Sequence, residues 1–381
     1  MTAFELTAEQ QDFGREVTAL AAGELRPVAA AGAPGHVNRE LVKAMGRLGL
    51  LARLFPGQGH RVSAMDLCLM REALATQSTE AETALALQGL GAYPILQSGT
   101  EETVRRWLPA VAAGDAVAAF ALTEPEAGSD AAALSLLAEP DGDGWRLTGE
   151  KMWISNAPEA DVYTVFARTT LAAGARGVTA FAVPGDRAGL GGEHLDMVSP
   201  HPIGRLTFDG VRVEAAEILG EQDRGFSVAM RTLNLFRPSV GAFAVGMARA
   251  AIEAAVAHAG TRTAFGGPLR DQQAVSHLLA EMVTRTEAAR LVVYAAAAAY
   301  DAGGEGGSGG ARGIAARSAM AKLFATETAQ FVVDAAVQIH GARALRRGHL
   351  LEHLYREVRA PRIYEGASEV QRTIIARELY R

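Results

Sequence analysis

The chain has 381 residues, of which 49% are hydrophobic and 21% are charged, as is typical of a soluble globular enzyme with two or three packed units. The net charge of −6 argues against nucleic acid as the main partner, since phosphate binding needs an excess of basic residues. Cys68 is the only cysteine, which excludes an intramolecular disulfide and fits a reducing compartment. We see no secretion signal and no uninterrupted apolar stretch of membrane-spanning length, so we expect a cytoplasmic protein that does not enter the membrane.

Residues 1–119 are expected to be helical. Thr7 begins a capping-box pattern, and the apolar residues after it recur on one helix face. Asn38 can cap a further helix by accepting a hydrogen bond from a free backbone N–H, Ser63 precedes another helical segment, and Gly99 with Thr100 separates two more.

Residues 120–226 have a different pattern. Short runs rich in β-branched and aromatic residues, separated by Gly, Pro and Asp turns, occupy 144–148, 162–167, 178–183 and 206–208. These runs predict a small antiparallel barrel or sandwich.

Helical periodicity returns in residues 227–381. Long Ala-rich segments cover 239–260, 271–300 and 313–340. The sequence GGEGGSGG at 303–310 is typical of a flexible connection between two helices of a bundle rather than of a domain linker.

Four motifs stand out against this background. They are ALTEPEAGSD at 121–130, WISN at 153–156, RTAFG at 262–266 with Gln272 and Gln273 after it, and YEG at 364–366 before a last helix that carries Arg377. Through these motifs the chain resembles the acyl-CoA dehydrogenase family of flavoenzymes over essentially its whole length. The resemblance implies a mostly α protein with a central β-domain: an N-terminal α-helical domain (1–119), a middle antiparallel β-barrel (120–226) and a C-terminal four-helix bundle (227–381).

The resemblance also implies FAD as the cofactor. It places Thr123 near the N1/O2 edge of the isoalloxazine, Trp153 against the ring and the Ser155 hydroxyl at N5. Without the resemblance, Trp153 could equally be an aromatic core residue and Ser155 a turn residue.

Two further segments are implied to hold the diphosphate of FAD. Gly128 and Ser129 allow backbone N–H groups to approach it, although a surface turn would look the same, and Asp130 fits a turn better than a ligand. Arg262 supplies the positive charge, whereas without the resemblance it could be a solvated residue at a helix C-terminus.

In the family, the positions of Arg262, Phe265 and Gln273, and those from Gln338 to Ala342, reach the cofactor of a neighbouring subunit. The resemblance therefore implies a homo-oligomer, a dimer of dimers. The full set of predicted cofactor-binding residues is Leu122, Thr123, Gly128, Ser129, Trp153, Ile154, Ser155, Arg262, Phe265, Gln272, Gln273, Gln338, Gly341, Ala342, Ala367, Ser368 and Glu369.

Glu365 is the predicted catalytic base. Removal of an α-proton from a thioester requires a carboxylate whose pKa is raised in an enclosed apolar site. The alternative is an ordinary acid that precedes a helix and is stabilised by the helix dipole. Some family branches place the base immediately before the arginine equivalent to Arg237, but this chain has Phe236 there, so Glu365 is the only family base position with a carboxylate.

The activity implied is FAD-dependent α,β-dehydrogenation of an acyl thioester to the trans-2-enoyl product, with an electron-transferring flavoprotein as acceptor. The predicted substrate-binding residues are Ser129, Asn234, Arg237, Gly366 and Arg377, and no metal site is expected. Two alternatives stay open. One is a flavin-dependent oxidase that uses oxygen, although its nitroalkane branch has Asp as base; the other is a non-catalytic flavoprotein.

The sequence departs from the family pattern near the substrate and the cofactor. Ala367 and Ala342 replace a usual Thr and Gly, Asn234 replaces a frequent acid, and a basic stretch at 343–347 replaces a glycine- and aromatic-containing one. The loop SPHPIG at 199–204 stands where relatives commonly have Ser and Thr near the pantetheine arm. We therefore expect intact chemistry, with either CoA or an acyl carrier protein as the thioester carrier.

Overall fold

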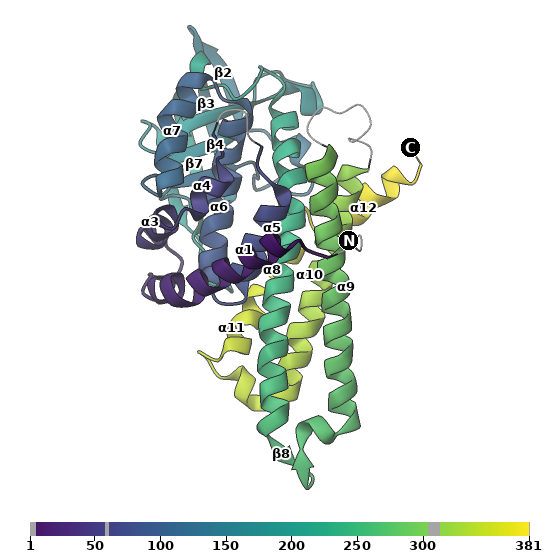
Figure 1. The fold of residues 1–381 in the computed structure, drawn as a ribbon. Helices are drawn as coiled ribbons and strands as arrows, with labels where there is room; N and C mark the ends of the chain where they lie inside the picture. Colours follow the sequence, from purple (N-terminus) through teal and green to yellow (C-terminus); the bar gives the residue numbers. More distant parts are fainter. Residues whose placement is uncertain (1–4, 58–60, 304–312, 381) are drawn as a thin grey trace. The chain divides into compact units, whose positions relative to one another are not determined.

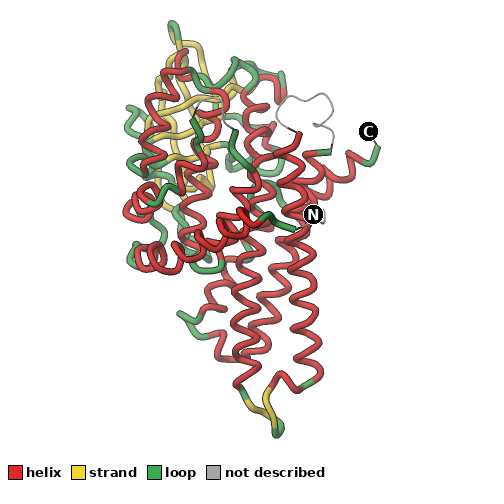
Figure 2. Tube along the Cα trace, viewed as in Figure 1, coloured by secondary structure: helices red, strands yellow, loops and turns green. Residues whose placement is uncertain are grey.

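The computed structural model describes residues 5–57, 61–303 and 313–380. By its internal contacts the chain forms two compact units: unit 1 consists of Met1–Gly23, Ser63–Glu82 and Asn234–Arg381, and unit 2 of Glu24–Val62 and Thr83–Leu233. Figure 1 follows the chain through both units, and Figure 2 shows that most strands gather in one region, apart from a short pair at the end of the long helices. The predicted boundaries of the three domains stay a prediction.

The first part of the chain is helical, as predicted. The structure has a π-helical turn at Ala21–Leu25 and the helices α1 (Ala8–Leu20), α2 (Arg26–Ala30), α3 (Arg39–Arg47), α4 (Leu50–Leu54), α5 (Ala64–Ala75), α6 (Thr79–Ser98) and α7 (Glu101–Ala113). The predicted caps at Thr7 and Asn38 are confirmed, and Ser63 and Thr100 also cap helices: each of the four accepts a hydrogen bond from the backbone N–H three residues later.

A seven-stranded sheet lies in unit 2. Its strands are β1 (Ala118–Ala121), β2 (Leu137–Asp141), β3 (Gly144–Ser155), β4 (Val162–Arg168), β5 (Val178–Pro184), β6 (Leu190–His194) and β7 (Ile203–Glu214). The order is β1-β4-β2-β3-β7-β6, and β5 pairs with β4. The pairs are antiparallel apart from β1–β4 and β2–β4, which run parallel because the segments between these strands return the chain to the same end of the sheet. Each of the four predicted strand segments lies inside a strand.

The core of this sheet is made of alternating apolar residues. Leu147, Tyr163, Phe181 and Val211 are buried in one cluster, with Val37 packed against it from the loop before α3. This packing fixes the loops at the strand ends, where two of the four motifs lie.

The C-terminal region is a helical bundle, also as predicted. It contains α8 (Gly225–Thr261), the short hairpin strands β8 (Thr263–Ala264) and β9 (Gly267–Pro268), α9 (Gln273–Gly303), α10 (Ile314–His340), α11 (Leu350–Glu357) and α12 (Ser368–Glu378). The three long helices, α8, α9 and α10, lie side by side in Figures 1 and 2. A Cβ added to Gly241 would lie 2.7 Å from Val293 Cγ2 and 3.1 Å from Ala321 O, so small residues allow the helices to approach. Most of the predicted glycine-rich connection lies outside the described residues.

Helix α8 is long and apolar enough, by length and composition alone, to cross a membrane, although Arg231, Arg237 and Arg249 interrupt its apolar sequence. However, 67% of its most apolar stretch of 18 residues is buried within the structure. Burial of this kind is what the core helix of a helical bundle requires.

Candidate active site

Trp153 presents its indole ring to solvent at the end of β3. The register between β3 and β7 shifts between Lys151 and Ile154, and Trp153 has a φ of +61°. Its side chain is 51% exposed, which excludes the alternative that it is a core residue. The irregular strand end therefore leaves a flat aromatic surface free to contact a planar ring.

A buried ion pair joins Glu124 of the first motif to Lys151, two residues before the second motif. Lys151 Nζ lies 2.8 Å from Glu124 Oε1 and donates to Leu122 O at 3.0 Å. The Glu124 carboxylate also accepts hydrogen bonds from the backbone N–H groups of Ser135 and Leu136. Burial raises the pKa of Glu124, but Lys151 and these N–H groups together lower it by more than burial raises it. The pKa of Glu124 therefore lies below its ordinary value. Sequence reasoning missed this pair because its two residues are 27 positions apart.

Ser155, the predicted donor to flavin N5, is hydrogen-bonded to His201. Ser155 Oγ lies 2.9 Å from His201 Nε2, and the next residue, Asn156, donates its N–H to Pro202 O at 2.6 Å. Burial lowers the pKa of His201 to about 4, so its imidazole is neutral at neutral pH. The loop at 199–204, which the sequence marked only as a departure from the family, therefore holds and orients the Ser155 hydroxyl.

The remaining predicted residues of unit 2 differ in exposure. Gly128, Ser129 and Asp130 are exposed, and nothing lies within 4 Å of a Cβ added to Gly128, so the backbone there is open to a ligand. Leu122 and Ile154 are buried. They contribute to the site by holding the neighbouring motif residues in place.

The Arg262 motif lies in unit 1, in the hairpin after α8. Arg262 is exposed, and its backbone donates to His258 O and accepts from Leu269 N, both at 2.8 Å. Phe265 is 94% exposed with a φ of +52°. Gln272 and Gln273 follow at the start of α9. The hairpin thus presents a cation and an aromatic ring without burying either.

A cationic cavity of about 580 Å³ lies in the same unit between the C-terminal parts of α8 and α10 and the start of α11. Gln338, Gly341 and Ala342 are exposed and are neighbours in sequence of the lining residues His340 and Arg343. Arg343 and Arg346, from the basic stretch that departs from the family pattern, face this cavity. Its lining residues are Ala254, Ala257, His258, Thr261, His340, Arg343, Arg346 and His349.

These features fit FAD. An open aromatic face at Trp153, a hydroxyl at Ser155 and an accessible backbone at Gly128 suit a flavin ring and its attached phosphates. The exposed cation of Arg262 and the exposed ring of Phe265 suit a diphosphate and a nucleoside.

Glu365 lies in a strained turn of unit 1 immediately before α12. Its φ is +52°, which is unusual for a residue other than glycine. Gly366 follows with a φ of +93°, and an added Cβ there would lie 2.6 Å from Gln371 Nε2. Gln371 donates to the carbonyls of Glu365 at 3.2 Å and Gly366 at 2.8 Å, and Arg237 Nε donates to the Glu365 carbonyl at 3.2 Å. The backbone of the turn is thus held by side chains from α8 and α12.

A buried lysine completes this support. Lys322, from α10, is fully buried, and its Nζ donates to Tyr364 O at 2.8 Å and to Gly366 O at 2.6 Å. These two carbonyls flank Glu365. Burial lowers the pKa of Lys322 to about 8. Sequence reasoning missed this role, because Lys322 lies in an Ala-rich helix 42 residues before Tyr364.

The Glu365 carboxylate is held in a buried, cationic setting. Its Oε2 atom is buried, and the described residues offer it no hydrogen-bond partner. Burial raises the pKa of Glu365, while Arg71, Lys322 and Arg237 partly offset the rise. Arg71 also forms a buried ion pair with Glu82. A carboxylate with a raised pKa and a free buried oxygen has the properties of a general base.

Comparisons with known proteins agree with this geometry. Models of the acyl-CoA dehydrogenase N-terminal, middle and C-terminal domains match residues 7–115, 119–211 and 223–380. The probable acyl-CoA dehydrogenase FadE25 of Mycobacterium tuberculosis is 35% identical over 99% of this chain and 97% of its own. The chain belongs to the acyl-CoA dehydrogenase family. It is thus an oxidoreductase that acts on CH–CH groups.

Two solved structures illustrate the likeness of fold. Butyryl-CoA dehydrogenase from Megasphaera elsdenii is 33% identical with a TM-score of 0.91, and the match covers all of both chains. PigA, in a complex with FAD and proline, is 25% identical with a TM-score of 0.90 over 100% of this chain and 99% of PigA. The fold predicted from the sequence, with its helical, β and helical parts, is confirmed.

The remaining predicted residues lie around the turn that carries Glu365 and on α12. Arg237 contacts the Glu365 backbone, and Asn234, one turn earlier on α8, accepts from Ser318 Oγ at 3.1 Å through its carbonyl. Ser368 is buried and donates to Glu327 Oε1 at 2.6 Å. Ala367 is half-buried, whereas Glu369 and Arg377 are exposed on α12.

Proposed function

We propose that this acyl-CoA dehydrogenase oxidises the Cα–Cβ bond of an acyl-CoA to the trans-2-enoyl thioester, with Glu365 as the base that takes the α-proton. The observation that carries this proposal is the buried, unpartnered Oε2 atom of Glu365. A buried carboxylate oxygen without a hydrogen-bond partner is free to accept the α-proton of a substrate. An exposed glutamate before a helix would not need such a setting.

The chain's own residues have separable roles in this reaction. When bound, FAD supplies the acceptor for the β-hydride at its N5 atom. Trp153 offers the ring a wall, Ser155 offers a hydroxyl oriented by His201, and Arg262 offers a charge to the diphosphate. Glu365 holds the α-proton on its carboxylate after abstraction, and its strained turn keeps that carboxylate in one position.

The predicted partners follow from the same proposal. We infer acyl-CoA rather than an acyl-carrier-protein thioester, in line with the family, and an electron-transferring flavoprotein as acceptor. The exposed side chains of Phe265 and Leu345 in unit 1 support a homo-oligomer, since large apolar side chains at a surface commonly mark an interface. The single, buried Cys68 supports a reducing, cytoplasmic location.

Anaerobic mixing with short, branched and medium-length acyl-CoAs tests the proposal. Bleaching of the oxidised flavin is expected with at least one of them. Rapid peroxide formation in air would favour an oxidase instead, and an unchanged spectrum with every thioester would favour a non-catalytic flavoprotein.

Glu365→Gln provides the residue-level test. The variant should purify with FAD bound but lose turnover by about 10²–10⁴-fold, as expected for the loss of a positioned base. Glu102→Gln, at an exposed position of α7, is the matched control and should react normally. Near-normal activity of Glu365→Gln would end the assignment of the base.

A further inference from the structure

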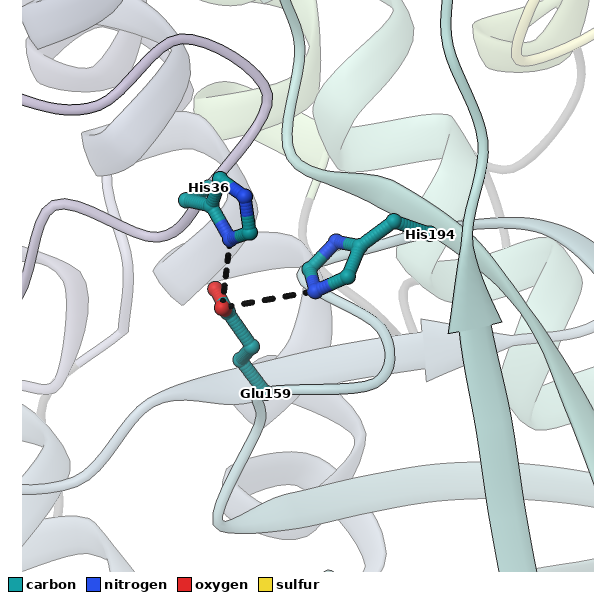
Figure 3. A group of neighbouring side chains, drawn as sticks. All are labelled: His36, Glu159 and His194. Atoms are coloured by element: carbon teal, nitrogen blue, oxygen red, sulfur yellow. Dashed lines mark hydrogen bonds and ion pairs between the residues drawn. The ribbon is translucent and has the colours of Figure 1, made fainter.

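A histidine–glutamate–histidine group lies on the surface of unit 2, and none of its three residues belongs to the four motifs. His36 comes from the loop between α2 and α3, Glu159 from the turn between β3 and β4, and His194 from the last residue of β6. Figure 3 shows both imidazole rings directed at the same carboxylate. His36 Nδ1 lies 2.8 Å and His194 Nε2 lies 3.5 Å from Glu159 Oε1, and the three candidate ligand atoms lie within 4.8 Å of one another.

The protein holds these three residues in place through their backbones and neighbours. Val37 N donates to Glu159 Oε2 at 2.6 Å, which leaves Oε1 directed toward the histidines. Arg39 Nη2 donates to Glu159 O at 2.6 Å, and its other nitrogen pairs with Asp161 at 2.7 Å, so Arg39 carries no uncompensated charge that would repel a cation. Val37 also packs on the core of the sheet.

The other two segments are fixed as well. His194 ends an antiparallel pair of strands, in register with Gly204 of β7. Asn38 caps α3 and donates to Val28 O at 2.9 Å, which closes the loop that carries His36. The two imidazole rings have centroids 4.3 Å apart. Three segments far apart in the sequence thus deliver their side chains to one point.

The three side chains are better explained as ligands of a zinc ion than as an ordinary surface ion pair. Two imidazole nitrogens and one carboxylate oxygen are zinc ligands with an open fourth position for water. Ligands of a tetrahedral Zn²⁺ at about 2.0–2.1 Å lie about 3.3 Å from each other. The two distances from Glu159 Oε1 to the histidine nitrogens, 2.8 and 3.5 Å, are close to that value. The side chains of His36, Glu159 and His194 are 49%, 30% and 36% exposed, so an ion can enter from solvent.

We propose that His36, Glu159 and His194 form a surface site for Zn²⁺. The ion joins the loop before α3 to the β3–β4 turn and to β6, and water fills the remaining coordination position. The sequence did not predict this metal site, because its residues are 123 and 35 positions apart.

Zinc titration of the full-length protein tests the site. The protein is stripped with EDTA, exchanged into chelator-free buffer and titrated with ZnCl₂ by calorimetry, and bound zinc is counted by elemental analysis. One zinc per chain and a melting temperature that rises with zinc concentration are expected, because the ion binds the folded form.

Variants locate the zinc. His36→Gln and His194→Gln should each weaken zinc binding by at least about tenfold, since loss of a supporting partner alone costs that much at many metal sites. The double variant should lose both zinc and the shift in melting temperature, yet melt like the wild type in EDTA. His277→Gln removes an exposed histidine of α9 and should bind zinc normally.

A second histidine group makes the test discriminating. His258 and His340 stack with ring centroids 4.2 Å apart in the cationic cavity of unit 1. If His340→Gln loses the zinc while the double variant keeps it, the ion binds in that cavity and the proposal is wrong. Failure of the wild type to bind zinc would overturn it equally.

Discussion

Replacement of Lys322 by methionine tests how the turn that carries the base is supported. Lys322 is fully buried and donates from one nitrogen to the carbonyls of Tyr364 and Gly366, on either side of Glu365. Methionine has a similar length and fills similar space but has no donor and no charge. The variant thus removes the two hydrogen bonds and the cation together.

The loss of one hydrogen bond to a backbone carbonyl sets most of the change that Lys322→Met makes to the free energy of unfolding. Gly366 O keeps its hydrogen bond from Gln371, whereas Tyr364 O loses the bond from Lys322. A buried carbonyl left without its partner costs about 1–3 kcal/mol. We therefore expect the free energy of unfolding, measured with urea, to fall by about that amount, with part of the loss offset because a buried ammonium is no longer desolvated.

The electrostatic effect has a definite sign. Burial raises the pKa of Glu365, and the nearby cations, Lys322 among them, lower it toward its ordinary value. Since the base acts only when ionised, kcat/KM should rise with pH through the raised pKa. Without Lys322 that pKa rises further, so the acidic limb of the profile moves to higher pH. Lys322 has a pKa of about 8, so its effect operates below that pH, where it is charged.

Gln371→Leu is the matched control for this shift. It removes neutral hydrogen bonds from Gln371 to the carbonyls of Glu365 and Gly366 but leaves every charge in place. It should destabilise the turn and lower activity while the acidic limb stays where it is. If Lys322→Met and the wild type share the same limb, Lys322 supports the backbone only and our reasoning about its charge is refuted.

Three further predictions concern the cofactor site and its support. Lys151→Met leaves the Glu124 carboxylate buried without its ion-pair partner, so the free energy of unfolding should fall by about 3–5 kcal/mol in a urea titration; an unchanged midpoint would contradict a structural role. Arg262→Ala should release FAD and loosen the oligomer, which gel filtration and the flavin spectrum measure; a yellow protein of unchanged size would rule out the cross-subunit site. Burial lowers the pKa of His201 to about 4 from 6.5, so protonation should destabilise the fold as pH falls through that interval, and His201→Gln should flatten this dependence in thermal melts.

Local sequence patterns predicted much of the fold because they act over a few residues. Thr7, Asn38 and Ser63 cap helices through hydrogen bonds to the N–H three positions on, a spacing visible in the sequence. The strands were equally visible as β-branched runs between turns. The position of Glu365 in a glycine-containing turn before α12 was also predictable, since Gly366 can adopt a positive φ.

The contacts that support the site were not predictable in this way. Lys151 and Glu124, Ser155 and His201, and Lys322 and Tyr364 are 27, 46 and 42 positions apart. Such pairs depend on which strands and helices become neighbours, and no period or motif records that. The parallel pairing of β1 with β4 is a further example.

Each unit contains a buried lysine that donates to backbone carbonyls beside predicted site residues. Lys151 donates to Leu122 O in the ALTEPEAGSD motif, and Lys322 donates to the carbonyls on either side of Glu365. Burial lowers the pKa of both lysines to about 8. A neutral amine still has two N–H donors, so both lysines can keep their hydrogen bonds to backbone carbonyls after they lose their charge. As the pH rises, the charge of Lys322 that lowers the pKa of Glu365 should therefore be lost before the hydrogen bonds that hold the turn. The effect of Lys322 on the carboxylate can thus be separated from its effect on the backbone.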